Sequence, residues 1–323
     1  MLESPRIGVA IPCYKVREHI LGVIENIPPR VERIYVVDDC CPDQSGTLIL
    51  GQCTDPRVCI ITHAINQGVG GAVQTAYQAA IEDGMDIVVK IDGDGQMNPG
   101  LLPLFIGPIA RGQADYTKGN RFYRPESLKD MPPMRLFGNA MLSLITKFSC
   151  GYWSCMDPTN GYTAVHTSVL RKLPLEKIDK RYFFETDMLY HLNTIRAVVR
   201  DVPMDAVYGD EISNLRIKHV LPEFLRKHTS RFFKRYTYLY LLRDFNIGSL
   251  YSILGIILCF WGIVFGGIHW SHSLVTGVIA SSGTVMAAAL PLIIGIQFLI
   301  AFLHYDVSHI PHEPLSVELD DDV

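Results

Sequence analysis

The stretch IVVKIDGDGQ at residues 87–96 joins a short apolar run to an acidic turn, and it decides the fold that we expect. Three similar runs precede it, each bounded by turn residues, at 7–11, 34–37 and 58–61. Helical patterns separate the runs, at 16–26, 45–52 and 70–82. This alternation of strands and helices predicts a parallel sheet with helices on both faces.

Candidate functional residues directly follow three of these runs. They are Pro12 and Tyr14 after the first run, Asp38 and Asp39 after the second, and the acidic turn 92–96 after the fourth. In sheets of this kind, ligands bind at the carboxyl ends of the strands. The sequence therefore predicts one site assembled from these turns.

The glycines argue against a dinucleotide-binding domain. The G-x-G-x-x-G of that fold should follow the first strand, where this chain has Pro-Cys-Tyr. A glycine cluster, Asn66–Gly71, follows the third run instead. Its backbone N–H groups can bind an anion at the start of a helix. A helix-start turn without a ligand explains the same glycines.

Asp92 and Asp94 are separated by one residue at the end of an apolar run. Both carboxylates can reach one hard cation, and Mg²⁺ prefers one or two carboxylates together with substrate phosphate oxygens. Such an ion would neutralise the charge that develops on a departing diphosphate. A solvated acidic loop is the alternative for an isolated D-x-D. An EF-hand is excluded because the ligand frame of that loop is missing.

Two long uncharged stretches lie towards the carboxyl end, at 248–268 and 283–303. As a helix, each is long enough to cross a hydrocarbon core of about 30 Å. Membrane helices tolerate the internal Pro291 and the glycines. The alternative is a pair of helices buried in a large soluble core.

The basic residues predict the orientation in the membrane. All 29 Lys and Arg residues precede residue 244, and eight of them lie between Arg216 and Arg243. The connecting loop 269–282 contains none. By the positive-inside rule, the long N-terminal part and the acidic tail are cytoplasmic. We therefore expect an integral protein of the inner or plasma membrane.

Residues 221–242 interleave basic side chains with aromatic ones such as Phe232 and Tyr236. This mixture predicts a helix in the headgroup layer, with its cations towards lipid phosphates. Nucleic-acid binding is set aside for this segment because it leads directly into a span.

The composition excludes several protein classes. With 48% hydrophobic residues, the chain is neither disordered nor collagen-like. Its eight cysteines show no C-x-x-C pair and no zinc spacing, which predicts reduced thiols in the cytosol. No secretory signal is expected at the start, because Met1–Tyr14 lacks a sufficient apolar run.

Five motifs of this chain occur in the order and spacing of a known family. They are Ile11–Tyr14, Val36–Asp39 with Asp43, Asn66–Gly71, Asp92–Gln96 with Pro99, and Lys118–Phe122. In these motifs the chain resembles the family 2 inverting glycosyltransferases of GT-A fold, and with two C-terminal spans it resembles the polyprenyl-phosphate glycosyltransferases. The resemblance implies an α/β fold with a Rossmann-like mixed sheet and flanking helices, followed by interfacial helices and two transmembrane helices.

The resemblance implies a UDP- or GDP-linked sugar as donor and Mg²⁺ or Mn²⁺ as cofactor. The base and the ribose would be held by Pro12, Tyr14, Asp38 and Asp39. From the glycine cluster, Asn66 and Gly70 would also contact the donor. The metal and the diphosphate would be held by Asp92, Asp94 and Gln96.

The resemblance also implies an acceptor side. Arg121 would stabilise the transferring or acceptor phosphate with its bidentate fork, although a surface arginine is the alternative. Asp157 begins the Asp-x-x-x-Gly-aromatic turn near the acceptor. Together with Asp94, these two residues are the catalytic candidates. Further substrate contacts are implied for Arg135, on a segment over the site, and for Glu185, at a helix start.

The chain departs from the family pattern at two places. The family's Arg-x-x-Gly-x-Ser-Lys after the last strand is replaced by residues 208–216, so we nominate Arg216 and Lys218 as substitute cations for a phosphate. Cys41 replaces the serine of the Asp-Asp-x-Ser turn, which removes a hydroxyl cap.

One missing carboxylate predicts the acceptor. A hydroxyl acceptor must lose its proton to a base, which hydroxyl-transferring members place as the Asp of a Glu-Asp pair. Thr186 stands at that position. A phosphate acceptor is already anionic, so polyprenyl phosphate is favoured. Transfer to a hydroxyl of a lipid-linked saccharide is the alternative, with Asp187 or Asp157 as its base.

The expected organisation has four parts. They are a cytoplasmic glycosyltransferase domain (1–215), basic amphipathic interfacial helices (216–246), two transmembrane helices (247–305) and an acidic cytoplasmic tail (306–323). The expected partners are the nucleotide sugar, the polyprenyl phosphate and the membrane, without nucleic acid; a homo-oligomer is left open. A membrane-anchored nucleotide-sugar binder without turnover is the competing class, and the D-x-D and Arg121 argue against it.

Overall fold

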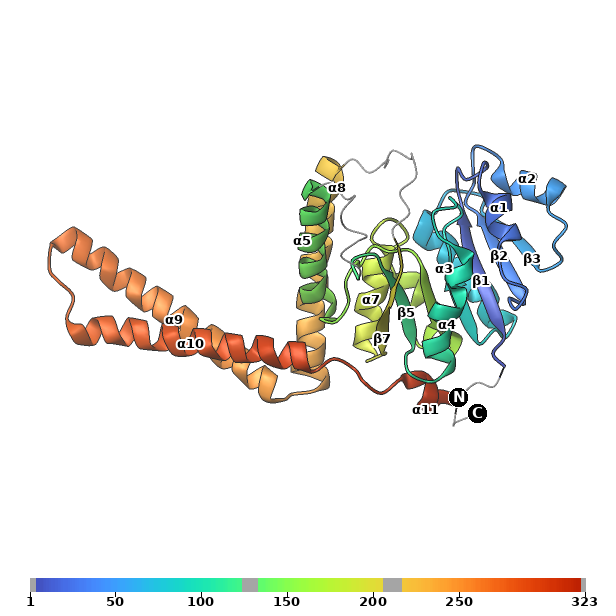
Figure 1. Ribbon diagram of the computed structural model, residues 1–323. Coiled ribbons are helices and arrows are strands. Elements are labelled where there is room, and N and C mark those ends of the chain that lie inside the picture. Colours follow the sequence, from blue (N-terminus) through green and yellow to red (C-terminus); the bar gives the residue numbers. More distant parts are fainter. Residues whose placement is uncertain (1–3, 124–132, 206–216, 321–323) are drawn as a thin grey trace. The chain divides into compact units, whose positions relative to one another are not determined.

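A computed structural model describes residues 4–123, 133–205 and 217–320, except for the side chains of 133–135, 217–221 and 318–320 (Figure 1). The chain divides into two compact units. The first unit contains the chain up to Phe232 and the tail from Pro311 onwards. The second unit is Phe233–Ile310.

The first unit is built on a seven-stranded sheet of order β3-β2-β1-β4-β6-β5-β7. Its strands are β1 (Ile7–Cys13), β2 (Arg33–Asp38), β3 (Val58–Thr62), β4 (Ile87–Lys90), β5 (Tyr116–Asn120), β6 (Thr163–His166) and β7 (Val199–Pro203). The four strands expected from the apolar runs are confirmed. β6 is antiparallel to β4 and β5, whereas the other pairs are parallel. The sheet is therefore mixed, as the resemblance implied and the alternation did not.

Helices cover both faces of this sheet. The helices of this unit are α1 (Ile20–Glu25), α2 (Ser45–Gln52), α3 (Val69–Glu82), α4 (Leu102–Ala110), α5 (Pro133–Cys150), α6 (Thr167–Leu170), α7 (Phe184–Thr194), α8 (Ile217–Tyr236), whose last residues belong to the second unit, and α11 (Leu315–Asp320). The helix expected at 16–26 begins only at Ile20, after a turn at residues 17–19, and ends at Glu25.

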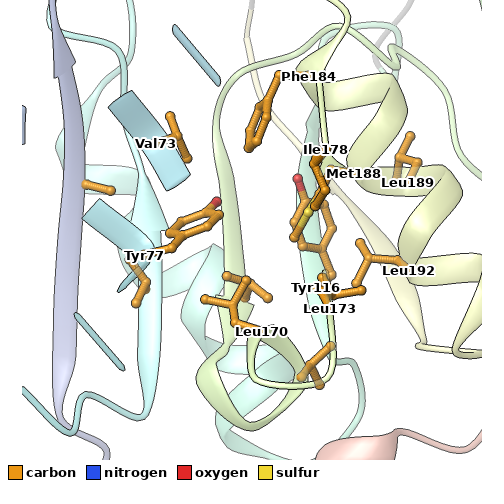
Figure 2. Close-up of a cluster of buried hydrophobic side chains, with 14 of the residues drawn as sticks. Val73, Tyr77, Tyr116, Leu170, Leu173, Ile178, Phe184, Met188, Leu189 and Leu192 are labelled. Carbon is orange, nitrogen blue, oxygen red and sulfur yellow. The ribbon is translucent and has the colours of Figure 1, made fainter. Parts of the chain in front are cut away.

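Two apolar cores fix the helices on the sheet. One core includes side chains of α3, α6 and α7 on one face, and the other includes α1, α2 and α4 on the opposite face. Figure 2 shows part of the first core, where Tyr77 of α3 and Met188 of α7 gather with Tyr116 of β5. This packing holds the start of α7 close to the helix that follows the glycine cluster.

The second unit is mainly a helical hairpin of α9 (Ile247–Thr276) and α10 (Ser282–Ser308), both long and apolar enough to cross a membrane. Gly255, Gly262 and Gly295 lie in their contact, where an added Cβ would come within 2.7–2.9 Å of the other helix. Small residues allow membrane helices to approach this closely. The expected loop at 269–282 is shorter, because α9 continues to Thr276 and ends at Gly277, whose φ is 69°.

A buried ion pair joins the end of α8 to α10 within the second unit. The Arg235 guanidinium donates two hydrogen bonds to Asp306, at 2.7 and 2.9 Å, and the Tyr240 hydroxyl donates a third at 2.6 Å. Tyr240 belongs to the π-helical segment Thr237–Arg243 that follows α8. The expectation that Arg235 faces lipid phosphates is therefore wrong, since its cation is held inside the protein.

The tail returns to the first unit and docks on Asp115, just before β5. The buried Asp115 carboxylate accepts the backbone N–H groups of Leu315 and Ser316, at 3.0 and 2.8 Å, at the start of α11. It also accepts the Val198 N–H at 2.7 Å. One carboxylate thus joins the tail to the sheet, and both ends of the hairpin lead into the same unit.

Replacing Asp115 tests this attachment. Asp115→Ala leaves three backbone donors without their acceptor, which we expect to cost at least about 2 kcal/mol of folding free energy. Thermal unfolding of the purified chain measures the loss. Ser316→Ala keeps the backbone N–H and serves as the matched control. An unchanged midpoint for Asp115→Ala would show that the attachment contributes nothing to stability.

Candidate functional site

The site lies where the strand order reverses. From β1 the chain proceeds outwards to β2 and β3, and then returns to place β4 on the other side of β1. In sheets of this kind, ligands bind at the carboxyl ends of the strands beside this point. Pro12 lies near the end of β1 and is followed by the half-exposed Tyr14, and the turn that carries Asp92 follows the neighbouring strand β4.

The two aspartates at the end of β2 accept hydrogen bonds from neighbouring loops. Asp38 accepts the N–H groups of Cys41 and Gly46, at 2.8 and 2.9 Å. Asp39 accepts those of Gln67 and Gly68, at 2.8 and 2.7 Å. Both carboxylates are buried. Their part in nucleotide binding stays a prediction, and the observed role is to hold the loops that follow β2 and β3.

The Asn66–Gly71 cluster packs against the backbone that precedes α7. An added Cβ at Gly70 would lie 2.5 Å from the Asp179 carbonyl oxygen, and one at Gly68 would lie 2.5 Å from the Lys180 carbonyl oxygen. The Asn66 amide donates to the Asp39 carbonyl at 3.1 Å. Close backbone packing therefore explains these glycines, and the donor contacts of Asn66 and Gly70 stay predictions.

Lys90, which sequence reasoning missed, joins the acidic turn to α7. Its ammonium donates to Asp92 Oδ1 at 2.8 Å, to the Gly161 carbonyl at 3.1 Å and to Glu185 Oε1 at 3.2 Å. Burial opposes the charge on Lys90, but Asp92 and Glu185 outweigh burial and raise the pKa of this lysine. Burial also raises the pKa of Glu185, against the attraction of Lys90.

Asp92, Asp94 and Gln96 share the turn after β4. Asp92 keeps 31% of its side chain exposed beside Lys90, and the Gln96 N–H donates to Asp94 Oδ1 at 3.0 Å. Among the described residues, no three His, Cys, Asp or Glu side chains converge as a preformed metal cage. Two carboxylates on one turn fit a Mg²⁺ or Mn²⁺ ion that completes its coordination with substrate phosphates and water.

Arg121 and Asp157 form a bidentate pair. The guanidinium donates to the two carboxylate oxygens of Asp157, at 2.7 Å each, and the Asn160 amide donates to Oδ2 at 3.1 Å. Burial works against the Asp157 charge, but Arg121 and Lys118 prevail and lower the pKa of Asp157. Asp157 is thus an anion that positions a partly exposed cation.

A second buried lysine supports the same turn. Lys118 Nζ lies 3.1 Å from Asp201 Oδ1 and also donates to the Asp157 carbonyl at 3.1 Å. In the sheet register Lys90, Thr163, Lys118 and Asp201 are neighbours on four successive strands. A lysine at the end of the apolar run IVVK is the sequence signal that could have identified Lys90, whereas Lys118 belongs to the motif Lys118–Phe122 and its partner Asp201 had no such signal.

The carboxylate nearest to the expected base position, that of Asp187, is also paired with an arginine. Asp187 is fully buried, and its Oδ1 lies 2.6 Å from Arg231 Nε on α8. Burial raises the pKa of Asp187, although Arg231 opposes that change. The expectation that Arg231 faces lipid phosphates is therefore wrong, since it is paired inside the first unit.

Two predicted contacts have no described side chain. Arg135 lies in the first turn of α5, and only its backbone is described. Arg216 lies outside the described residues. The same holds for the nominated Lys218, which begins α8 with its backbone alone.

Relatives with known activities share most of this first unit. The chain is 30% identical to a UDP-N-acetylglucosamine–dolichyl-phosphate N-acetylglucosaminyltransferase of Methanococcus voltae, over 63% of this chain and 86% of the relative. It is 29% identical to the polyprenol monophosphomannose synthase of Mycolicibacterium smegmatis, over 62% of this chain and 77% of the relative.

Solved structures share the fold. Mannosyl-3-phosphoglycerate synthase from Rubrobacter xylanophilus superposes with a TM-score of 0.56 at 18% identity, over 74% of this chain and 77% of that one. Glucosyl-3-phosphoglycerate synthase from Mycobacterium tuberculosis, in complex with Mn²⁺ and UDP, gives 0.51 at 18% identity, over 72% and 78%. The model of the family described as "Glycosyl transferase family 2" matches residues 8–174, so the chain is a glycosyltransferase of that family, with a GT-A fold.

Proposed function

We propose that this glycosyltransferase moves a sugar from a nucleotide sugar to a polyprenyl phosphate at the cytoplasmic face of a membrane. One observation carries the choice of acceptor. The carboxylates considered as bases, Asp157 and Asp187, are each paired with an arginine, and Glu185 is paired with Lys90. A hydroxyl acceptor needs a carboxylate that can take up its proton, whereas a phosphate attacks as the anion it already is.

The donor would bind at the carboxyl ends of the neighbouring strands β1 and β4. Tyr14 and the Asp39 loop would face the nucleoside, and Asp92, Asp94 and Gln96 would hold Mg²⁺ or Mn²⁺ together with the diphosphate. When bound, the ion would neutralise the charge on the leaving diphosphate. The complex of a fold relative with Mn²⁺ and UDP supports this arrangement.

Arg121 would hold the acceptor phosphate. Its side chain is 27% exposed, while the Asp157 side chain beneath it is only 2% exposed. The guanidinium is thus held by a buried carboxylate while part of its side chain stays exposed. A preorganised cation of this kind holds two negative groups together without having to reorganise during the reaction. The names of the two relatives, both polyprenyl- or dolichyl-phosphate enzymes, support a lipid phosphate as this acceptor.

Besides the hairpin of α9 and α10, an exposed apolar face of α5 supports a lipid acceptor. Phe137, Met141, Leu144 and Phe148 of α5 are all exposed, and their spacing places them on one face of the helix. An amphipathic helix with such a face binds at the membrane interface. Both ends of the α9–α10 hairpin return to the first unit, so the domain and the tail would lie on one side of the membrane. By the positive-inside rule, the basic residues favour the cytoplasm for that side.

Removing the metal or its ligand tests the donor site. We expect Asp94→Ala to lower turnover about a thousandfold, because the leaving diphosphate loses its counter-charge, and EDTA to reproduce this loss in the wild type. Product formation from radiolabelled nucleotide sugar is the measurement, with unfolding midpoints as the folding check. Glu25→Ala, at an exposed position of α1, is the matched control. Full activity in EDTA would contradict a metal-dependent reaction.

The state of Asp187 separates the two acceptors. With polyprenyl phosphate as acceptor, Asp187→Asn should keep kcat at saturating donor within about threefold, whereas loss of a general base costs roughly 10²–10⁴-fold. Arg121→Lys should lose at least about tenfold, because lysine lacks the bidentate fork. The product should release its sugar in mild acid, as a sugar-1-phosphate linkage does. An acid-resistant product, with kcat abolished in Asp187→Asn, would favour a hydroxyl acceptor.

The apolar face of α5 is tested with acceptors of different chain length. Replacing Phe137, Met141 and Leu144 together by serine should reduce turnover of a long-chain polyprenyl phosphate at least about tenfold. Turnover of a short, water-soluble analogue should stay within about twofold. Ala140→Ser, at an exposed position of the same helix, is the control. Equal losses with both acceptors would indicate misfolding instead of lost membrane contact.

A further inference from the structure

Two cations of α8 bind acidic side chains at and before α7. Lys227 Nζ lies 2.5 Å from Asp179 Oδ2, and Arg231 Nε lies 2.6 Å from Asp187 Oδ1. The Asp179 N–H donates to Asp187 Oδ2 at 2.8 Å, which joins the two pairs into one network. The Arg231 guanidinium also covers the Tyr190 ring, 4.9 Å from its centroid. Because separating a buried pair leaves a charge without a partner, this network holds α8 against α7 in one arrangement.

Through α7, the network is connected to Asp92, one of the residues proposed to bind the metal. Asp187 follows Glu185 by two residues, within one helical turn. Glu185 contacts Lys90 at 3.2 Å, and Lys90 contacts Asp92 at 2.8 Å. A shift of α7 would therefore change the position of the carboxylate proposed to bind the metal.

Through residues 179–181, the same network is connected to the glycine cluster Asn66–Gly71, which is predicted to contact the donor. The Gly71 N–H donates to the Lys180 carbonyl at 3.1 Å, and Lys180 Nζ donates to Gln67 Oε1 at 3.0 Å. From its other side this glycine loop is held by Asp39. Both halves of the donor site are thus in contact with elements that α8 holds.

We propose that Lys227 and Arg231 are positioning residues for the donor site, so that the affinity for a nucleoside diphosphate depends on the attachment of α8 to α7. α8 continues directly into the second unit at Phe233, which makes it the connection between the donor site and the membrane hairpin. This inference rests on the proposed function, because it concerns the metal and the diphosphate assigned there.

The test measures donor affinity in the full-length chain, in lipid nanodiscs, without turnover. UDP and GDP are titrated by calorimetry in the presence of Mn²⁺, and the tighter ligand is used throughout. Arg231→Gln and Asp187→Asn should each weaken its binding about tenfold, while kcat at saturating donor stays close to wild type. The double variant should bind no more weakly than either single variant, because both changes break the same pair.

Arg226→Gln is the matched control, since Arg226 is an exposed cation of the same helix. Its donor affinity should equal that of the wild type. Where Arg231→Gln does not fold, Arg231→Lys keeps the charge for Asp187 but loses the fork, and it should weaken binding in the same direction.

Two results would overturn the inference in different ways. Variants with a lower unfolding midpoint but wild-type affinity would show that the pairs only stabilise the fold. A wild-type chain that binds neither UDP nor GDP with Mn²⁺ would refute the proposed donor site itself, and the inference with it.

Discussion

The arrangement of the site depends on one buried ammonium group, that of Lys90. Its side chain is only 1% exposed, and its three partners come from the turn after β4, the turn before β6 and the start of α7. A buried charge is tolerated only while its partners stay in place, so these segments keep a single arrangement. Gly161 belongs to the same constraint, because a Cβ there would lie 2.5 Å from both Lys90 Nζ and Asp92 Oδ2.

Paired acids recur throughout the molecule, and they give the site its chemical character. Asp157 holds Arg121, Asp201 holds Lys118 and Asp187 holds Arg231, each time between different elements. Each of these acids therefore holds a cation in position. A site built in this way suits a reaction between two anionic groups, in which the main difficulty is electrostatic repulsion.

The sequence predicted most of the framework because its signals are local. The four apolar runs and the helices at 45–52 and 70–82 follow from patterns a few residues long, and the structure confirms them. The long uncharged stretches likewise predicted α9 and α10, although α9 extends to Thr276. Arg231 and Arg235 were assigned to the lipid interface because a helical pattern does not show which cation meets a buried acid from another element.

Residue types and their order determined by themselves that this chain is an α/β glycosyltransferase with two apolar helices after it. Strand periodicity, turn residues and the D-x-D are each formed by residues that are close together in the sequence. They can therefore be recognised without the tertiary structure. Only the tertiary structure decided the role of Lys90, the antiparallel β6 and the pairing of Asp187 with Arg231. These features join residues tens of positions apart, and burial, which makes a charge seek a partner, exists only once the chain has folded.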